Sequence, residues 1–482
     1  MRRHFIVALY TLLTAAIFLP RVTNLDTFLS PDEPQWERNT QNFVAALKTG
    51  DTKNFYQQPP PGITTQWLGA LSIHKLTWGE KRLPLALFLS AAVLYVTYIL
   101  RRGWGDAVAL AAGFFLAFNP LLIAHSRVLA MDALLGLCSL AAIVHHLLWI
   151  QKKRTSDIAL TGIFSALAIL SKLSAFGLVI YIIVGTILAI LSKKISWPGA
   201  LKGTGICIGA GLVTTIILFP TILTNFSYVW QGSMTFFATE HFQQQVHALG
   251  QWWYPQAFLL WTTPLQILGL VLVPFALYKK NQYRLPILLF LLFSLIFFLE
   301  IQYSIKKGDR YMLPVFVSFD IITAFVLGTL GKKHARLTLI VFIGSIVWQG
   351  YQIMNLHPYE LSYRNPWFAD VAQGRTMGWG EGLDLAAQYL NKKPDPENLL
   401  VAAYYEGSFA YHFKGKFTSA ERLGKETAEQ IGADYVVLYR TMQGRAPQRW
   451  ETKVLKEYAD KTPEHIITLN NEEYVWIYKV LP

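Results

Sequence analysis

The chain has 482 residues, of which 53% are hydrophobic and 14% aromatic, and its formal net charge at pH 7 is +13. Soluble proteins of this length are rarely so apolar. The two cysteines, Cys138 and Cys207, both fall inside apolar runs, so they support neither a disulfide framework nor a metal site.

The first apolar run is HFIVALYTLLTAAIFLP, from His4 to Pro20, and it follows two arginines as the core of a signal peptide would. A signal peptide also needs a small-residue cleavage site, whereas this run ends in Phe-Leu-Pro followed by Arg21. We therefore expect a retained first membrane helix.

Further runs of similar length follow with little or no charge. They are Pro84 to Leu100, Ala107 to Ala124, Ala133 to Ile150, Leu173 to Leu191, Gly203 to Ile222, Ala257 to Tyr278, Leu285 to Leu299 and Leu337 to Met354. Two other candidates are the shorter run Ile158 to Leu170 and the run Tyr311 to Leu330, which contains Asp320. Helices of about 17–25 apolar residues span a bilayer, and helices alone satisfy their backbone within one segment there. The sequence predicts a polytopic α-helical membrane protein with about eleven spans.

The positive charge is concentrated in every second connector between these runs. The basic clusters are Arg2-Arg3, Arg101-Arg102, Lys152 to Arg154, Lys193-Lys194, Lys279-Lys280 with Arg284, and Lys332-Lys333 with Arg336. This is the positive-inside pattern, so it accounts for the charge without a nucleic-acid partner. It predicts an integral plasma-membrane protein with a cytoplasmic amino terminus. An odd number of spans then places the carboxyl terminus outside.

The chain divides into a membrane part, residues 1–354, with a first outer loop at 21–82, and an extracytoplasmic tail, residues 355–482. The sequence of the tail predicts a small α/β domain. GEGLDLAAQYLNKK has the apolar spacing of an amphipathic helix. LLVAAYY, DYVVLYR and EYVWIYKVL are rich in β-branched and aromatic residues, as strands are.

Charged residues also gather on the predicted outer face. Asp32 and Glu33 lie between two prolines just after the first span, where proline disfavours regular helix. The others come from separate connectors: Arg127, Asp132, Lys172, Glu240, His241, Lys306, Lys307, Asp309 and Arg310. Charges near a bilayer are costly and usually have a partner or a function. A carboxylate that accepts a proton beside cations that neutralise a phosphate would suit transfer from a phosphate-linked donor.

Structural roles remain open for several of these residues. Arg127 and Lys172 lie at predicted helix ends, where a long cationic side chain can instead extend to the membrane–water interface. Asp132 can instead cap the helix that it begins. A lone histidine such as His241 is more often structural than a ligand. Asp320 lies in mid-span, and the sequence identifies neither a partner nor a role for it.

Taken in order, these segments resemble the GT-C superfamily of polyprenyl-phosphate-sugar glycosyltransferases, in particular protein O-mannosyltransferases and lipid A aminoarabinose transferases. SPDEPQWERN and the later FYQQPPPG are similar to their first outer loop, with its Asp-Glu pair and Pro-Pro segment. HSRVLAMDALL, which contains Arg127 and Asp132, resembles their Ser-Arg-x-x-x-x-Asp segment. SKLSAF, FFATEHFQQQ and GDRYMLPV, the last with Arg310 and Tyr311, resemble later motifs. The resemblance extends from the first helix to about Pro314.

The resemblance implies an inverting transfer of a sugar from a polyprenyl-phosphate donor on the extracytoplasmic face. Asp32 would be the catalytic base, and Glu33 would position Asp32 or its loop. The expected ligands of the donor phosphate are Arg127, Lys172 and Arg310, with Lys306 and Lys307 in reserve. The acceptor would be a hydroxyl of a protein, a lipid or a glycan.

The resemblance also leaves a divalent metal open as a cofactor. The aminoarabinose transferases carry a Glu-Lys pair before their two prolines, which supplies a metal ligand and a phosphate contact. Gln57 and Gln58 stand at those positions, and neutral amides replace neither group fully. The remaining candidates for holding a cation are His241 with Glu240, or Glu33.

Other classes of protein would also be polytopic and charged. A glycan polymerase or ligase with a diphosphate-linked donor would use a similar constellation. A lipid or sugar transporter would place its charges near the midplane between repeated halves. A scaffold or sensor built around the tail would leave the charged residues of the membrane part without a role. The outer-face constellation favours the transferase.

Overall fold

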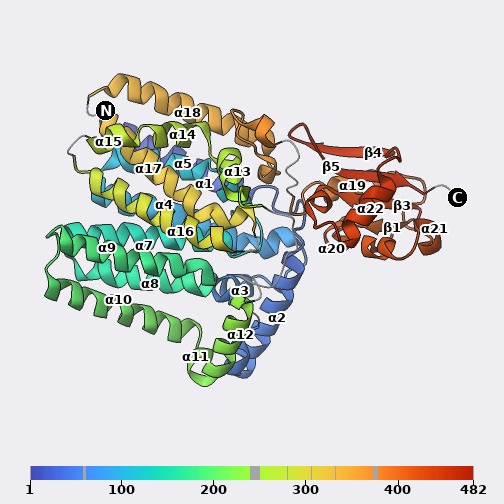
Figure 1. The fold of residues 1–482 in the computed structure, drawn as a ribbon, viewed down its shortest axis with the longest axis horizontal. Coiled ribbons are helices and arrows are strands. Elements are labelled where there is room, and N and C mark those ends of the chain that lie inside the picture. Colours follow the sequence, from blue (N-terminus) through green and yellow to red (C-terminus); the bar gives the residue numbers. More distant parts are fainter. Residues whose placement is uncertain are drawn as a thin grey trace.

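The computed structural model describes residues 2–57, 61–238, 250–278, 281–304, 307–331, 333–372 and 378–480. A helical bundle and a smaller domain with a β-sheet lie end to end (Figure 1). The amino terminus lies at the end of the bundle away from the sheet. We call the opposite end, which faces the sheet, the domain end.

The bundle is built from helices of very different lengths. They are α1 (Arg2–Val22), α2 (Glu33–Thr49), α3 (Ile63–Ala70), α4 (Trp78–Trp104), α5 (Asp106–Ala117), α6 (Pro120–Ser126), α7 (Asp132–Lys152), α8 (Thr155–Ser171), α9 (Phe176–Leu191), α10 (Trp197–Leu218), α11 (Thr221–Thr224), α12 (Phe226–Ala238), α13 (Trp253–Trp261), α14 (Pro264–Val271), α15 (Val273–Tyr278), α16 (Arg284–Tyr303), α17 (Leu313–Gly331) and α18 (Ala335–Leu356). Within the described residues, eight helices are long and apolar enough to cross a membrane, or ten if each of two bent pairs is one span. The shorter apolar helix α8 covers the remaining predicted run. The chain is an integral membrane protein.

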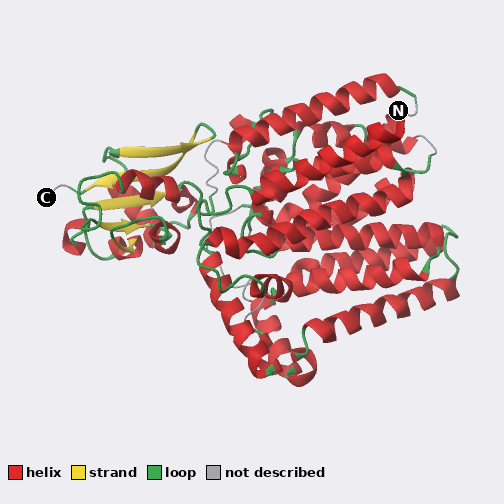
Figure 2. Ribbon diagram, turned by 180° about the vertical axis from the view of Figure 1, so that it is seen from behind, coloured by secondary structure: helices red, strands yellow, loops and turns green. Residues whose placement is uncertain are grey.

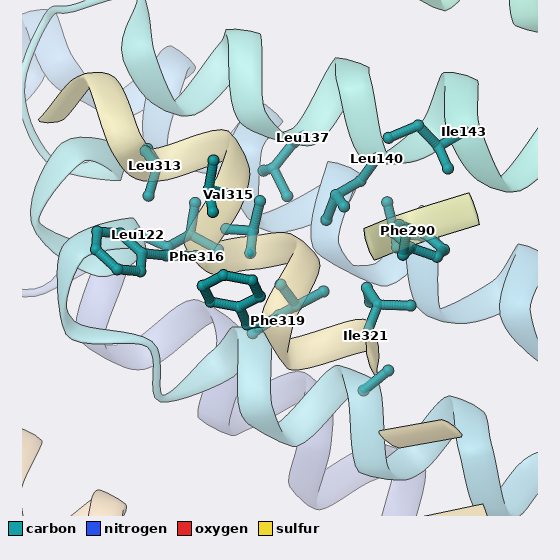
Figure 3. Close-up of a cluster of buried hydrophobic side chains, with 14 of the residues drawn as sticks. Leu122, Leu137, Leu140, Ile143, Phe290, Leu313, Val315, Phe316, Phe319 and Ile321 are labelled. Atoms are coloured by element: carbon teal, nitrogen blue, oxygen red, sulfur yellow. The ribbon is translucent and has the colours of Figure 1, made fainter. Parts of the chain in front are cut away.

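The core of the bundle lies around α7 and α17, which are apolar on all sides and almost entirely buried. Figure 3 shows side chains of α6, α7, α16 and α17 interlocking there, among them Leu140, Phe290 and Phe316. In α1, α10 and α18, by contrast, most of the apolar surface is exposed. Apolar surface of this kind faces lipid in a membrane protein, so these helices lie at the periphery.

Three of the basic connectors, those that follow α4, α7 and α9, lie together at the end of the bundle opposite the domain end (Figure 1). The Lys152 ammonium donates to the carbonyl oxygen of Arg102 at 2.7 Å, and that of Lys153 donates to the carbonyl of Lys194. Three connectors that the sequence places on one side of the membrane are thus joined. This agrees with the charge pattern from which the topology was predicted.

Two of the predicted spans are broken. The run Ala107 to Ala124 bends by 64° between α5 and α6, and the run Ala257 to Tyr278 bends by 108° between α13 and α14. In each bent pair, the second helix begins with a proline that follows a capping residue. Asn119 accepts a hydrogen bond from the Leu122 amide, and Thr263 forms a capping box with Gln266. Caps and prolines start helices rather than continue them, so continuous helices were the wrong expectation here.

Both breaks are joined to Asp320 on α17. One oxygen of its carboxylate accepts a hydrogen bond from the Asn119 amide at 2.8 Å, and the other accepts from the Gln266 amide at 2.7 Å. A carboxylate buried in mid-span is tolerated when such donors satisfy it. The partner that the sequence did not reveal is thus a pair of amides, one from each broken span.

The tail holds a five-stranded sheet in the order β2-β1-β3-β5-β4 (Figure 2). The strands are β1 (Leu400–Ala403), β2 (Lys416–Ser419), β3 (Tyr435–Tyr439), β4 (His465–Leu469) and β5 (Glu472–Lys479), with helices α19 (Leu383–Leu390), α20 (Glu406–Ala410), α21 (Ala428–Ile431) and α22 (Trp450–Tyr458). β1 runs parallel to β2 and β3, whereas β5 runs antiparallel to β3 and β4. The predicted helix and strands correspond to α19, β1, β3 and β5, so the expected α/β tail is confirmed.

Candidate functional site

Asp32 and Arg310 meet at the domain end. Asp32 precedes α2, where its backbone carbonyl accepts from the amide of Trp36 while its side chain makes no capping bond. The carboxylate instead accepts a hydrogen bond at 2.8 Å from Arg310, which lies just before α17. The two side chains are 42% and 24% exposed, so a ligand can reach this pair.

A second ion pair lies beside the first. The ammonium of Lys172, between α8 and α9, donates to the carboxylate of Asp132 at 2.7 Å. Arg310 Nε lies 3.9 Å from the other oxygen of Asp132, so it joins the two pairs. The ring of Tyr311 lies 3.9 Å from the Lys172 ammonium. We call Asp32, Asp132, Lys172, Arg310 and Tyr311 the charged cluster.

The structure also shows which of the expected roles Asp132 and Lys172 have. Asp132 is the first residue of α7 and forms no side-chain cap, because its carboxylate is taken by Lys172. The Lys172 side chain is only 13% exposed and points to an acid rather than to the interface. Both residues therefore belong to the cluster.

Glu33 differs from its neighbour in being fully buried. Arg82 of α4 donates to both of its oxygens, at 2.7 and 2.6 Å. The backbone amides of Ser30 and Leu129 donate to it as well, at 2.9 and 2.8 Å. Glu33 thus ties the loop that carries Asp32 to α4 and to the segment before α7. Sequence reasoning missed Arg82, although its charge at the start of an apolar run was a signal.

Arg127 was predicted to bind phosphate, and its guanidinium lies among backbone carbonyls. It donates to the carbonyl oxygens of Thr23 and Asn24 at 2.8 and 2.9 Å, and also to that of Pro20. Its Nε lies 3.6 Å from the carboxylate of Glu360. These contacts hold the end of α1 and join it to the segment after α18.

The other predicted residues lie outside the charged cluster or outside the described residues. The Lys307 ammonium donates to the carbonyl of Gln302 at 2.8 Å and lies 5.0 Å from the ring of Tyr254. Gln57 donates to the carbonyl of Asn54. Lys306, Gln58, Glu240 and His241 lie outside the described residues. Within the described part of the chain, no three His, Cys, Asp or Glu side chains group as a metal site, so the metal stays a prediction.

Two aromatic residues that sequence reasoning missed lie in line beside the charged cluster: Trp379 lies against Arg310, and His125 lies against Trp379. The ring of Trp379, at the start of the tail domain, lies 4.4 Å from the Arg310 guanidinium carbon. On α6, His125 is buried with its ring 5.3 Å from that of Trp379, and its Nδ1 has no hydrogen-bond partner among the described residues. His125 stands two residues before Arg127 in a segment already singled out, whereas nothing in the sequence distinguished Trp379.

A family model for dolichyl-phosphate-mannose-protein mannosyltransferases matches residues 57–223. The chain also resembles the crystal structure of ArnT from Cupriavidus metallidurans in the apo state, with a TM-score of 0.57 and 14% identity over 99% of this chain and 98% of that one. The chain has the GT-C fold. ArnT bound to undecaprenyl phosphate gives a TM-score of 0.51 at 14% identity over the same shares of the two chains.

A second GT-C protein gives a similar result. The oligosaccharyltransferase AglB from Archaeoglobus fulgidus, in complex with an inhibitory peptide and a dolichol-phosphate, matches with a TM-score of 0.51 and 13% identity, over 91% of this chain and 70% of that one. No curated protein matches the sequence. At these identities the shared property is the GT-C fold, and the expectation of that fold is confirmed.

Proposed function

We propose that the protein is an inverting glycosyltransferase that moves a sugar from a polyprenyl-phosphate donor to a hydroxyl-bearing acceptor on the extracytoplasmic face. The observation that carries this proposal is the pairing of the accessible Asp32 carboxylate with Arg310 at the domain end, where Arg310 also reaches the Asp132–Lys172 pair. The GT-C fold and the mannosyltransferase family model support it. So do the lipid phosphates in the ArnT and AglB structures.

The charged cluster has the groups that such a transfer needs. The acceptor hydroxyl attacks C1 of the sugar on the face opposite the phosphate and gives its proton to Asp32. The new C1–O bond forms as the C1–O bond to phosphate breaks, so the configuration at C1 inverts. The departing phosphate gains negative charge, and Arg310 and Lys172 stabilise it. A guanidinium has five N–H donors, so Arg310 can bind phosphate while it still donates to Asp32.

Substitution of the base tests the proposal. With protein purified in lipid nanodiscs, Asp32→Asn is expected to lower transfer from polyprenyl-phosphate sugars by about 10²–10⁴-fold. Binding of polyprenyl phosphate and the melting temperature should change little, because Asn keeps the size and hydrogen-bonding capacity of the side chain. Asp51→Asn is the matched control, since Asp51 lies in the same loop and only caps a short turn. Near-normal transfer by Asp32→Asn would remove the base.

The same assay separates the rival functions. Transfer from diphosphate-linked sugars alone would identify a polymerase or ligase. Lipid-dependent movement of sugar without transfer would identify a transporter. The acceptor is found by offering protein, lipid and glycan hydroxyls in turn. An inverting enzyme gives a product whose C1 configuration is opposite to that of the donor.

The proposed sidedness needs its own measurement. Lys425 of the tail and Ser156 at the start of α8 are both exposed. After Cys138 and Cys207 are replaced by alanine, a cysteine at Lys425 should react with an impermeant reagent outside intact cells, and one at Ser156 should react only after lysis. The reverse pattern would place the charged cluster in the cytoplasm.

A further inference from the structure

The start of the tail domain reaches into the charged cluster. Trp379 packs against the core of the helical bundle and not only against its own domain. Its ring faces the Arg310 guanidinium at 4.4 Å and the His125 ring at 5.3 Å. A cation over an aromatic face is attracted by the ring quadrupole, and tryptophan gives the strongest attraction. One tail residue therefore contacts the cation that holds Asp32.

The loop Gly378 to Gly382 is fastened to the tail domain at several points. The backbone amide of Trp379 donates to the buried Glu381 carboxylate at 2.6 Å, and that of Gly380 donates to the Tyr439 hydroxyl at 3.0 Å. The Thr441 hydroxyl donates to the carbonyl of Gly378 at 2.7 Å. The backbone that carries Trp379 is thus held by the fold of the tail.

The same loop lies on the backbone that leads to Asp32. Gly380 has φ +103°, and a Cβ added there would lie 2.4 Å from the carbonyl oxygen of Leu29. A larger residue at this position would therefore separate the two loops and strain the backbone. The tail therefore contacts Arg310 directly and also approaches the backbone at Leu29, three residues before Asp32.

We infer that Trp379 is a positioning residue through which the tail domain completes the donor-phosphate site. This inference rests on the proposed function, in which Arg310 binds the phosphate. The indole ring lies 4.4 Å from the guanidinium carbon, while Nη1 donates to Asp32 and Nε lies 3.9 Å from Asp132. Without the ring, Arg310 has a larger choice of rotamers, and ordering it on binding costs free energy.

The experiment compares Trp379→Leu with Trp379→Phe, measuring the binding of polyprenyl phosphate, and KM and kcat for transfer. Leucine keeps an apolar side chain without a π face, whereas phenylalanine keeps the face. Trp379→Leu is expected to weaken lipid-phosphate binding and raise KM about two- to thirtyfold, the range of a cation–π contact. Trp379→Phe should keep most of the lipid-phosphate binding, and its KM should stay close to that of the wild type. Trp367→Ala is the matched control, because Trp367 is an exposed tryptophan between α18 and the tail helix α19.

A double-mutant cycle with Arg310→Ala shows whether Trp379 acts through Arg310. In that background Trp379→Leu should have no further effect on binding. An additive effect, or equal losses by the Leu and Phe variants with equally lowered melting temperatures, would overturn the positioning role. Unchanged binding by Trp379→Leu would do so as well. If Arg310→Ala itself binds polyprenyl phosphate normally, the proposed phosphate site fails, which is a separate result.

Discussion

The Nη1 atom of Arg310 lies 2.8 Å from Oδ2 of Asp32, although 278 residues separate the two in the sequence. The pair therefore exists only when the first loop and the start of α17 are both in place. The accessible carboxylate is held by a cation in this structure. A donor phosphate would share or take over that cation, so binding of the donor and release of the carboxylate are linked.

Lys172 and Arg127 are predicted to fail in different ways. Lys172→Ala removes a cation of the charged cluster, so it should weaken donor binding and transfer. It should also lower the melting temperature, because among the described residues the buried Asp132 carboxylate keeps only Arg310, at 3.9 Å, as a counter-charge. Arg127→Ala leaves the carbonyls at the end of α1 unpaired, and should cost about 1–3 kcal/mol of stability. Thermal melts and lipid-phosphate binding of both variants check this. Loss of donor binding by a fully stable Arg127→Ala would restore its predicted role as a phosphate ligand.

Glu33→Gln is expected to destabilise the protein more than it slows transfer. It leaves the Arg82 guanidinium buried without a balancing charge, which costs about 3–5 kcal/mol. Glu37→Gln is the control, because Glu37 pairs with Lys81 at 2.7 Å in a more exposed position. That change should cost less than Glu33→Gln, because the Glu37 side chain is 22% exposed whereas Glu33 is fully buried. Equal melting temperatures for the two variants would contradict a supporting role for Glu33.

Glu381 gives a prediction about pH. Burial raises the pKa of this carboxyl above its ordinary value, with hydrogen bonds and Arg364 opposing the shift. The folded tail therefore holds the proton more tightly than the unfolded chain does. This contribution to stability is fully present below the ordinary pKa of about 4.3 and is lost as the pH rises through the raised value. Glu381→Gln, which cannot ionise, should gain in melting temperature relative to the wild type as the pH rises.

The comparison is made in melts at several pH values, with Glu429→Gln as the control. Glu429 is an exposed residue of the same domain, and hydrogen bonding from its own backbone amide and from Thr427 lowers its pKa. Replacing it should therefore not reproduce the trend. If the melting temperature of Glu381→Gln instead falls relative to that of the wild type at high pH, the ionised carboxylate stabilises the loop.

The link between the two broken spans can be tested within α17. Asp320→Ala leaves the amides of Asn119 and Gln266 without their acceptor, which should cost about 1–3 kcal/mol for each unsatisfied group. Ser318→Ala is the control, because Ser318 is equally buried and its hydroxyl bonds only to its own helix, at the carbonyl of Pro314. A melting temperature for Asp320→Ala no lower than that of the control would contradict the link.

Most of the fold could be predicted because a bilayer allows few solutions. Uncharged runs of sufficient length have to be helices, and the alternation of basic connectors orders them. The breaks at Asn119 and Thr263 were missed because composition was read over whole runs. The local signals were present, since both residues are good caps that precede proline.

The site was predictable only in part. Asp32, Lys172 and Arg310 were placed on one face because the alternation of basic connectors puts their three segments on the outer side. Which acid meets which cation depends on how distant helices pack, so the Asp132–Lys172 pair could not be read from spacing. Trp379 could not be found either, because tryptophans are frequent in this chain and its neighbours in space come from other segments.

The bonds of Asp320 also bear on how the chain is assembled during synthesis. Asn119 emerges from the ribosome 201 residues before Asp320, and Gln266 emerges 54 residues before it. Until α17 inserts, both amides lack their native acceptor at depths where water is scarce. The native hydrogen bonds of both bent segments therefore form only after α17 has been synthesised. A chain truncated before residue 320 lacks them, and we expect both bends to be less stable in it than in the full-length chain.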